Sequence, residues 1–218
     1  MEYFQNDQGK PILLAMVRAI QDNRNFLSEI DGLIGDGDHG VNMAKGFTRF
    51  EQSIAHQDVT LTEGLEQLGS ILLNEIGGSM GPIYGTIFLG MAEAAAQKQQ
   101  IDLAVFVRML RTGLDDLHEI IEAQVGDKTL VDTLSPAVEA LEQAAAQGDT
   151  FSHALETMKG AAASGRDSTK DQKARFGRSS RLGERSRGVL DAGAASCYIL
   201  LQSMAEEIQR LLREGDGV

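Results

Sequence analysis

Apolar residues recur every three or four positions along most of the chain, the spacing that places side chains on one face of a helix. Stripes of this kind run from Met43 to Ile54, from Leu61 to Ile76, from Leu103 to Ile121 and from Leu130 to Leu141. No stretch alternates apolar and polar residues clearly enough to predict a strand. The pattern predicts helices at roughly 10–29, 42–56, 61–76, 83–98, 103–123, 129–147, 151–164 and 191–213.

Two prolines lie within or beside these predicted helices. Pro82 follows the segment Gly77–Gly81 and stands where a helix would begin, since proline is favoured in the first helical turn. Pro136 leaves two alternatives open: it kinks a helix, or it begins one behind Ser135 as the N-cap.

Glycine-rich segments interrupt the helices at four places: 35–40, 77–81, 126–129 and 177–193. A pair of predicted helices lies between each segment and the next. In an antiparallel bundle, such a pair returns the chain to the end from which it started. We therefore expect all four segments at one end, where they would line one pocket. The chain is predicted to be all-α, a single domain over residues 1–218 that forms an antiparallel helical barrel or bundle.

The overall composition restricts the class of protein. Apolar residues make up 42% of the 218 positions, which is enough for a sizeable core. The net charge of -12 argues against nucleic acid and anionic membranes as partners. The single cysteine, Cys197, excludes an internal disulfide framework and fits a reducing compartment. No apolar run approaches the ~20 residues of a membrane span, and the first residues lack the apolar core of a signal peptide, so we expect a cytoplasmic protein.

Three aspartates, Asp31, Asp36 and Asp38, stand close together in a glycine-rich stretch. Carboxylates this close repel one another unless a cation neutralises them. Hard divalent cations prefer oxygen ligands, and Mg²⁺ is the usual one that also holds phosphates. The neighbouring glycines let the backbone turn tightly and approach a ligand. The stretch predicts a metal-bridged phosphate site, and the alternative left open is a solvated turn, since Asp-Gly pairs form turns.

Three better-known motifs do not fit this stretch. The glycine spacing from Gly35 to Gly40 matches the dinucleotide fingerprint, but that fingerprint follows a strand, whereas the residues before Gly35 are predicted to end a helix. A calcium-binding EF-hand loop requires Glu at its twelfth position, and loops starting at Asp36 or Asp38 end on other residues. The phosphate-binding pattern G-x-x-x-x-G-K-[ST] is absent from the sequence.

Residues 164–190 differ from the rest of the chain in being rich in glycine, serine and arginine. They hold eight basic residues and three acidic ones on a chain that is acidic overall. Loops of this length tend to be lids or binding loops, and the planar guanidinium of arginine suits phosphate. We interpret the segment, at about 164–193, as a capping loop over the phosphate site, and the alternative is a mobile charged loop.

Four stretches carry a family resemblance: IGDGDHGVNM (34–43), GGSMGPIYGT (77–86), GDKT (126–129) with Asp132, and GRSSRLGERS (177–186) with Asp191–Gly193. With these stretches the chain resembles the nucleotide-binding L subunit of bacterial dihydroxyacetone kinase, which is also the C-terminal domain of single-chain dihydroxyacetone kinases. The stretches occur in the order of the family and extend from about residue 31 to 196. The combination of all four is specific to the family.

The resemblance implies an all-helical barrel with the nucleotide capped at one end. It implies that Asp31, Asp36 and Asp38 hold two Mg²⁺ ions that bridge the nucleotide phosphates. It also implies that Leu130 packs against the base, that Arg178 with Asp191–Gly193 closes the cap, and that no catalytic residue is certain on this chain. The positions implied to contact the nucleotide are His39, Gly40, Val41, Asn42, Ser79, Met80, Thr129, Leu130, Arg178, Asp191, Ala192 and Gly193.

In the family, the carbonyl substrate is held covalently by a histidine of a separate K subunit. The resemblance therefore implies a phosphotransferase subunit that is active only with that partner, on dihydroxyacetone or a related small keto-sugar. Two modes of phosphoryl donation remain open. In the first, ADP stays bound as a coenzyme and is rephosphorylated by a phosphocarrier (M) subunit of the sugar phosphotransferase system. In the second, ATP binds and leaves as an ordinary substrate. A homodimer is also left open.

The chain departs from the family pattern near the predicted site. Met80 stands where serine is common and Ile121 where a small residue is common, while Val189 and Ala192 replace a histidine and a proline. These departures leave the three aspartates intact and keep the donor and the acceptor open. Two other classes are weighed: a nucleotide-sensing interaction protein derived from this fold, and a metal-dependent phosphohydrolase that uses the aspartates directly.

Overall fold

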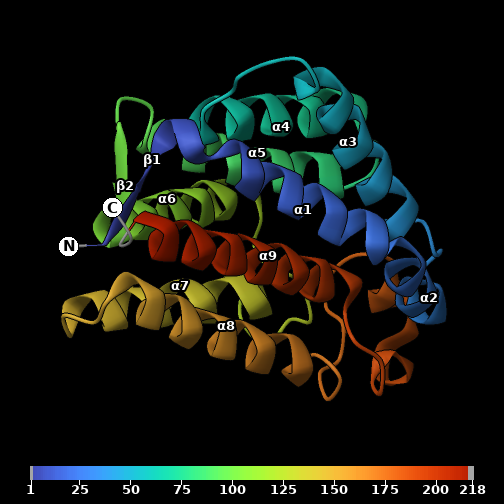
Figure 1. The fold of residues 1–218 in the computed structure, drawn as a ribbon. Coiled ribbons are helices and arrows are strands. Elements are labelled where there is room, and N and C mark those ends of the chain that lie inside the picture. Colours follow the sequence, from blue (N-terminus) through green and yellow to red (C-terminus); the bar gives the residue numbers. More distant parts are fainter. Residues whose placement is uncertain (1, 216–218) are drawn as a thin grey trace.

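Helices form most of the structure, a computed structural model that describes residues 2–215 (Figure 1). Two 3-10 helices, η1 (Asn6–Gln8) and η2 (Arg178–Ser186), and two short antiparallel strands, β1 (Tyr3–Gln5) and β2 (Gln100–Asp102), accompany the α-helices. The predicted all-α class is confirmed. The α-helices are α1 (Lys10–Asp22), α2 (Arg24–Ile34), α3 (His39–Ile54), α4 (Leu61–Glu75), α5 (Met80–Ala94), α6 (Leu103–Ile120), α7 (Val131–Ala146), α8 (Phe151–Ser168) and α9 (Ala192–Gly215).

The helices pack into a closed ring. Consecutive helices from α3 to α8 lie side by side, and α9 packs against α8 on one side and against α1 on the other. Helix α1 packs in turn against α3, which closes the ring. In Figure 1, α9 passes between an upper group formed by α1, α3, α4 and α5 and a lower pair formed by α7 and α8. The predicted helical barrel is therefore confirmed.

The interior of the ring is apolar. Phe47, Phe106 and Phe151 are fully buried, and the rings of Phe106 and Phe151 lie 5.6 Å apart between centroids. Burying a side chain of this size contributes roughly 1.5–3 kcal/mol. The predicted apolar stripes supply this core. Among the described helices, none has both the length and the apolar composition needed to cross a membrane.

The first predicted helix, 10–29, is wrong in its extent. The structure has two helices there, α1 and α2, which meet at Asn23. Asn23 leaves the helical conformation, with φ −96° and ψ 6°, and its side-chain amide donates to the carbonyl oxygen of Ala19 at 2.8 Å. Both helices carry an apolar stripe, so the periodicity continues across the bend and hides it.

Three shorter features also differ from the sequence prediction. Strands β1 and β2 have three residues each, which is too short for an alternating pattern to be recognised. Helix α5 begins at Met80 rather than at 83, so that Pro82 lies within its first turn. Pro136 lies inside α7, so the alternative that it begins a helix is wrong.

Residues 164–190, predicted as one long loop, are partly helical. Helix α8 continues to Ser168, and η2 occupies Arg178–Ser186. Within η2, Gly183 has a φ of 57° and divides the 3-10 helix into two parts. The many polar residues of η2 give no helical period, which is why the sequence pattern predicts a loop. Residues 169–191 are called the cap below.

The four glycine-rich segments lie at one end of the barrel, as predicted. Arg178 of the cap forms an ion pair with Asp36 in the first segment. Lys128 of the third segment donates to the carbonyl oxygen of Val189 in the cap. Tyr84 lies one turn into α5, just after the second segment, and donates to the carbonyl oxygen of Gly193 at 3.3 Å. This is the right-hand end in Figure 1, where α2 lies.

Candidate metal and phosphate site

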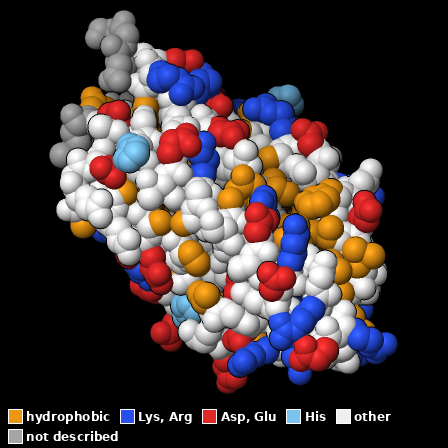
Figure 2. All heavy atoms as spheres, turned by 90° about the horizontal axis from the view of Figure 1, so that it is seen from below, with side chains coloured by type: hydrophobic (Ala, Val, Ile, Leu, Met, Phe, Trp, Pro, Cys, Tyr) orange, Lys and Arg blue, Asp and Glu red, His pale blue; other side chains and the backbone are white. Residues whose placement is uncertain are grey.

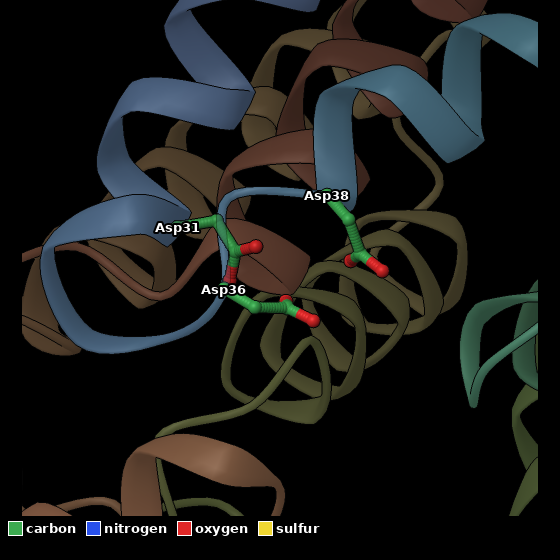
Figure 3. Close-up of side chains that lie close together, drawn as sticks. All are labelled: Asp31, Asp36 and Asp38. Carbon is green, nitrogen blue, oxygen red and sulfur yellow. The ribbon is translucent and has the colours of Figure 1, made fainter.

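Three carboxylates from one short stretch converge at this end. Asp31 stands in the last turn of α2, Asp36 in the turn that follows, and Asp38 immediately before α3. One oxygen from each carboxylate can be chosen so that the three lie within 4.8 Å of one another. Figure 3 shows all three side chains directed to the same side of the α2–α3 turn. The sequence prediction that these aspartates form one cluster is confirmed.

Two glycines allow the backbone to adopt this tight arrangement. Gly37 has a φ of 76°, a left-handed conformation that other residues adopt only with strain. Gly40 has a different role, because a Cβ added there would lie 2.0 Å from the carbonyl oxygen of Arg24 in α2. Gly40 therefore lets α3 approach the backbone of α2, and this close packing fixes where Asp38 stands relative to Asp31.

The electrostatics of the cluster favour a bound cation. Burial raises the pKa of Asp31, and the charges of Asp36 and Asp38 raise it further, while the backbone N–H of His39 lowers it by donating to the carboxylate at 3.3 Å. Arg178 provides one neutralising partner, at Asp36. The donor set consists of hard oxygens only, which fits Mg²⁺, an ion that keeps further positions for water and phosphate. The residues present therefore suit the metal that the sequence predicts.

The ring of His39 faces into the protein. It is buried, and burial lowers its pKa to about 4, so the imidazole is neutral at neutral pH. Its Nε2 lies 2.8 Å from the Oγ of Ser196, which lies 2.6 Å from the hydroxyl of Tyr84. This chain of contacts joins α3, α9 and α5 beneath the aspartates. Neither Ser196 nor Tyr84 stands out in the sequence, since both occur in helices whose partners are distant along the chain.

The segment between α6 and α7 is organised by a buried carboxylate. Asp132 accepts hydrogen bonds from the N–H of Gly126 at 2.6 Å, from the N–H of Thr129 at 2.8 Å and from the side-chain amide of Gln172 at 2.9 Å. Asp132 is 1% exposed, so water cannot replace these bonds readily. The side chain therefore sets the conformation of the predicted contact residues Thr129 and Leu130.

Replacing Asp132 by Ala is expected to destabilise the protein by about 2–4 kcal/mol, because three donors lose a charged acceptor inside the protein. Urea denaturation followed by circular dichroism measures this free energy. The matched control is Asp149→Ala, at the opposite end of α7, whose carboxylate contacts His153 at 3.8 Å on the surface. A loss below about 1 kcal/mol for the Asp132 variant would contradict the assigned role.

The start of α9 forms another side of the site. The carboxylate of Asp191 accepts the N–H of Ala194 at 2.8 Å, which caps the helix, and burial raises the pKa of this carboxyl to about 6. A Cβ added at Gly193 would lie 3.0 Å from this carboxylate and 3.5 Å from the backbone N of Leu130. Leu130 and Asp191–Gly193 are therefore neighbours, and Ala192 between them is buried.

The remaining predicted contact residues border the same end. Val41 is exposed on the first turn of α3, and Asn42 beside it is half-buried. Ser79 is exposed just before α5, while Met80 is half-buried and packs against the apolar core. The structure thus places all predicted positions around one end of the barrel. Their contacts with a nucleotide stay a prediction.

Fold and site together define a class of protein: an all-helical barrel that carries an acidic site of the metal-binding type at one end, covered by a basic cap. The model of the DAK2 domain matches residues 33–206, and the chain belongs to the DAK2 domain family.

Relatives with established names extend this finding. The chain is 36% identical over 188 residues to the ADP-binding subunit DhaL of PEP-dependent dihydroxyacetone kinase 1 from Listeria innocua, covering 86% of this chain and 89% of that one. It is 38% identical over 183 residues to the ADP-binding subunit DhaL of the PEP-dependent dihydroxyacetone kinase from Escherichia coli, covering 83% and 86%. The D-erythrulose kinase of Mycolicibacterium smegmatis is 31% identical over 88% of this chain, which matches 34% of that longer protein.

A solved structure supports the fold. The dihydroxyacetone kinase from C. freundii in complex with AMP-PNP and Mg²⁺ superposes with a TM-score of 0.73 and 23% sequence identity. The superposition covers 93% of this chain and 34% of that chain. At this identity the likeness establishes the barrel fold.

Proposed function

We propose that the chain is the ADP-binding subunit of a dihydroxyacetone kinase, a phosphotransferase that transfers a phosphoryl group from a nucleotide to dihydroxyacetone or a related small keto-sugar. The observation that carries the proposal is the cluster of Asp31, Asp36 and Asp38 under Arg178, at one end of a barrel of this family. Relatives that match along most of their length are named as such subunits.

In this proposal the three aspartates hold Mg²⁺, two ions per nucleotide, and the metal supplies neutralising charge to the phosphates. The first turn of α3 and the segment Gly77–Gly81 offer backbone N–H groups to the phosphates. Leu130 packs against the base, and Arg178 with Asp191–Gly193 closes the cap over the nucleotide. Phosphoryl transfer requires positioning and charge neutralisation more than covalent chemistry by the protein, which this residue set can supply.

The names of the relatives support one of the two donor modes. Relatives from Listeria innocua and Escherichia coli are called ADP-binding subunits of PEP-dependent enzymes. We therefore favour ADP as a resident coenzyme that a phosphocarrier subunit rephosphorylates, over ATP that exchanges in every turnover. A cap that covers the nucleotide fits a coenzyme, since a coenzyme stays bound between turnovers.

The exposed apolar side chains around the site support a partner that brings the acceptor. Large apolar residues at the surface usually mark a contact with another protein when they gather in one place. Figure 2, a view from below, shows hydrophobic side chains gathered toward the same right-hand side as the site end in Figure 1, with Lys and Arg among them. Independently of this view, six exposed large apolar residues belong to helix ends and loops at the site end: Leu33, Val41, Leu73, Ile120, Val125 and Phe176.

The first test identifies the nucleotide. The protein is purified without added nucleotide and denatured, and any released nucleotide is identified by chromatography and mass. Near-stoichiometric ADP supports the resident coenzyme. An empty protein that binds Mg-ATP reversibly makes ATP the donor, and a protein that binds neither nucleotide in the presence of Mg²⁺ contradicts the proposed function.

The partner surface has its own test. Leu33 is 63% exposed beside the aspartates, and Leu33→Asp is expected to lower phosphoryl transfer with a substrate-binding K subunit about 10-fold, because a charge would be buried in the contact. Binding of Mg-ADP should stay unchanged. The matched control is Tyr3→Asp, which alters an exposed apolar residue at the opposite end. Equal transfer rates for the Leu33 variant and the wild type would place the partner elsewhere.

A further inference from the structure

Lys128 adopts a conformation that lysine rarely adopts. Its φ is 63°, and among the described residues it is the one non-glycine residue with a positive φ. Such strain persists where the surrounding contacts hold it in place. The side chain is also 1% exposed, an unusual position for a group that carries an ammonium. Lys128 therefore combines a strained backbone with a buried charged side chain. We infer that the hydrogen bonds of its ammonium hold this conformation in place.

The ammonium binds the two ends of the cap. Its Nζ donates to the carbonyl oxygen of Thr169, where the cap begins, and to the carbonyl oxygen of Val189, close to where it ends. Carbonyl oxygens buried away from water need donors, and a charged donor gives stronger hydrogen bonds than a neutral one. One side chain from the α6–α7 segment thus joins both ends of a segment that follows much later in the sequence.

Other bonds align the two ends of the cap with each other. The N–H of Gly188 donates to the carbonyl oxygen of Lys170 at 2.7 Å, and the N–H of Asp191 donates to the Oγ1 of Thr169 at 3.0 Å. These bonds join residues 169–170 to residues 188–191 at the base of the cap, and this paired base is called the stem below. They do not attach the stem to the rest of the barrel in the way that Lys128 does.

The side-chain amide of Gln172 and the N–H of Arg175 also attach the cap, at 2.9 Å to the carboxylate of Asp132 and at 3.2 Å to the carbonyl oxygen of Asp127. Two ion pairs of the cap are more exposed than Lys128. Arg175 reaches Asp127 at 3.3 Å with 72% of its side chain exposed, and Arg178 reaches Asp36 with 68% exposed. Exposed ion pairs contribute little because water and salt screen them. The buried ammonium of Lys128 is therefore a stronger attachment than either ion pair, and among these attachments it is the one that holds both ends of the cap.

We propose that Lys128 is a positioning residue that keeps the cap closed over the carboxylate cluster and thereby slows release of the nucleotide. The part concerning the nucleotide rests on the proposed function, whereas the part concerning the cap stands on the contacts of Lys128. When the ammonium is removed, a buried carbonyl oxygen at Thr169 and a part-buried one at Val189 lose their donor, water enters the stem, and the open state of the cap gains population. Arg178 then spends less time at the aspartates.

The test compares three substitutions at one position with a control on the cap. Lys128→Met removes the charge and keeps the length of the side chain. Lys128→Gly removes the ammonium and also relieves the strained φ, so we expect this variant to fold even where the Met variant does not. Lys128→Arg keeps a positive charge and tests rescue. The control is Lys170→Met, which removes an exposed lysine from the cap while leaving its backbone unchanged.

The first readout needs no nucleotide. Hydrogen exchange of the cap amides, followed by mass spectrometry on the full chain, is expected to be about 10-fold faster in the Met and Gly variants and unchanged in Lys170→Met. The Arg variant should recover most of the protection. Unchanged exchange in both the Met and the Gly variant, with wild-type protection at the stem, would overturn the assignment of Lys128.

The second readout is the dissociation rate of a fluorescent ADP analogue in the presence of Mg²⁺. We expect it to rise about 10-fold or more in the Met and Gly variants, with the maximal transfer rate reduced much less. Faster cap exchange with an unchanged dissociation rate would overturn the link to nucleotide release. If the wild-type protein binds no analogue, both the proposed function and the link to nucleotide release are contradicted. Hydrogen exchange would still show whether Lys128 holds the cap closed.

Discussion

Asp38→Asn is expected to weaken the binding of Mg-ADP roughly 100-fold or more, since a direct metal ligand contributes at least as much as the outer partners whose loss costs 10–100-fold. Asn keeps the size of the side chain and removes the charge that the cation requires. Isothermal titration calorimetry at fixed Mg²⁺ measures the affinity. Chelation of Mg²⁺ from the wild-type protein should produce a loss of similar size.

The stability of the same variant should barely change. Asp38 precedes α3 without a side-chain bond to the helix, and its charge raises the pKa of Asp31. Removing it relieves a repulsion and loses a favourable interaction with the helix dipole, two effects of opposite sign that together stay within about 0.5 kcal/mol. The control Asp58→Asn makes the same charge change at an exposed residue between α3 and α4. Equal Mg-ADP affinity of Asp38→Asn and Asp58→Asn would show that the cluster holds no functional metal.

Gly40→Ala is expected to destabilise the protein by about 3 kcal/mol, because the added methyl would overlap the backbone of α2. The overlap involves the carbonyl oxygen of Arg24 at 2.0 Å and the backbone N of Ser28 at 2.8 Å, and backbone atoms cannot move aside as a side chain can. For a protein of this size, the melting temperature should fall by roughly 6–12 °C in differential scanning calorimetry.

A second glycine provides the control for this prediction. Gly160 lies within α8, and a methyl group added there meets nothing within 4 Å. Gly160→Ala should therefore raise stability by about 0.5–1 kcal/mol through helix propensity alone. The two substitutions are chemically identical, so their opposite signs isolate the close contact between α2 and α3. A melting temperature for Gly40→Ala at or above that of the wild type would contradict the assigned packing role.

Much of the barrel can be predicted from the sequence because its helices are long and amphipathic. A stripe that continues along all 18 residues of a helix, such as that of α6, leaves little ambiguity. The bend at Asn23 escapes prediction, since the apolar stripe continues on both sides and the capping amide is a local contact. Strands β1 and β2 depend on pairing between residues about a hundred positions apart, and three residues carry too little pattern to reveal it.

Some residues of the site can likewise be predicted from the sequence, and others cannot. Asp31, Asp36 and Asp38 can be predicted because they are neighbours in the chain and their charges need a common partner. Ser196 and Tyr84 cannot, because their positions depend on how α5 and α9 pack. Lys128 lies in the segment 126–129, which the sequence predicts to line the pocket, but its sequence position gives no sign of the left-handed backbone or of the bonds from its buried side chain to the cap.

Because α9 follows the aspartates in the chain, the site becomes complete only late in synthesis. Residues 191–196 contribute the last parts of the site, including the capping carboxylate of Asp191 and the hydroxyl of Ser196 that meets His39. Synthesis proceeds from the N-terminus, so the aspartates leave the ribosome long before these partners. The nascent chain therefore carries an acidic loop without the helix that closes the ring, and nucleotide capture has to wait until α9 has emerged.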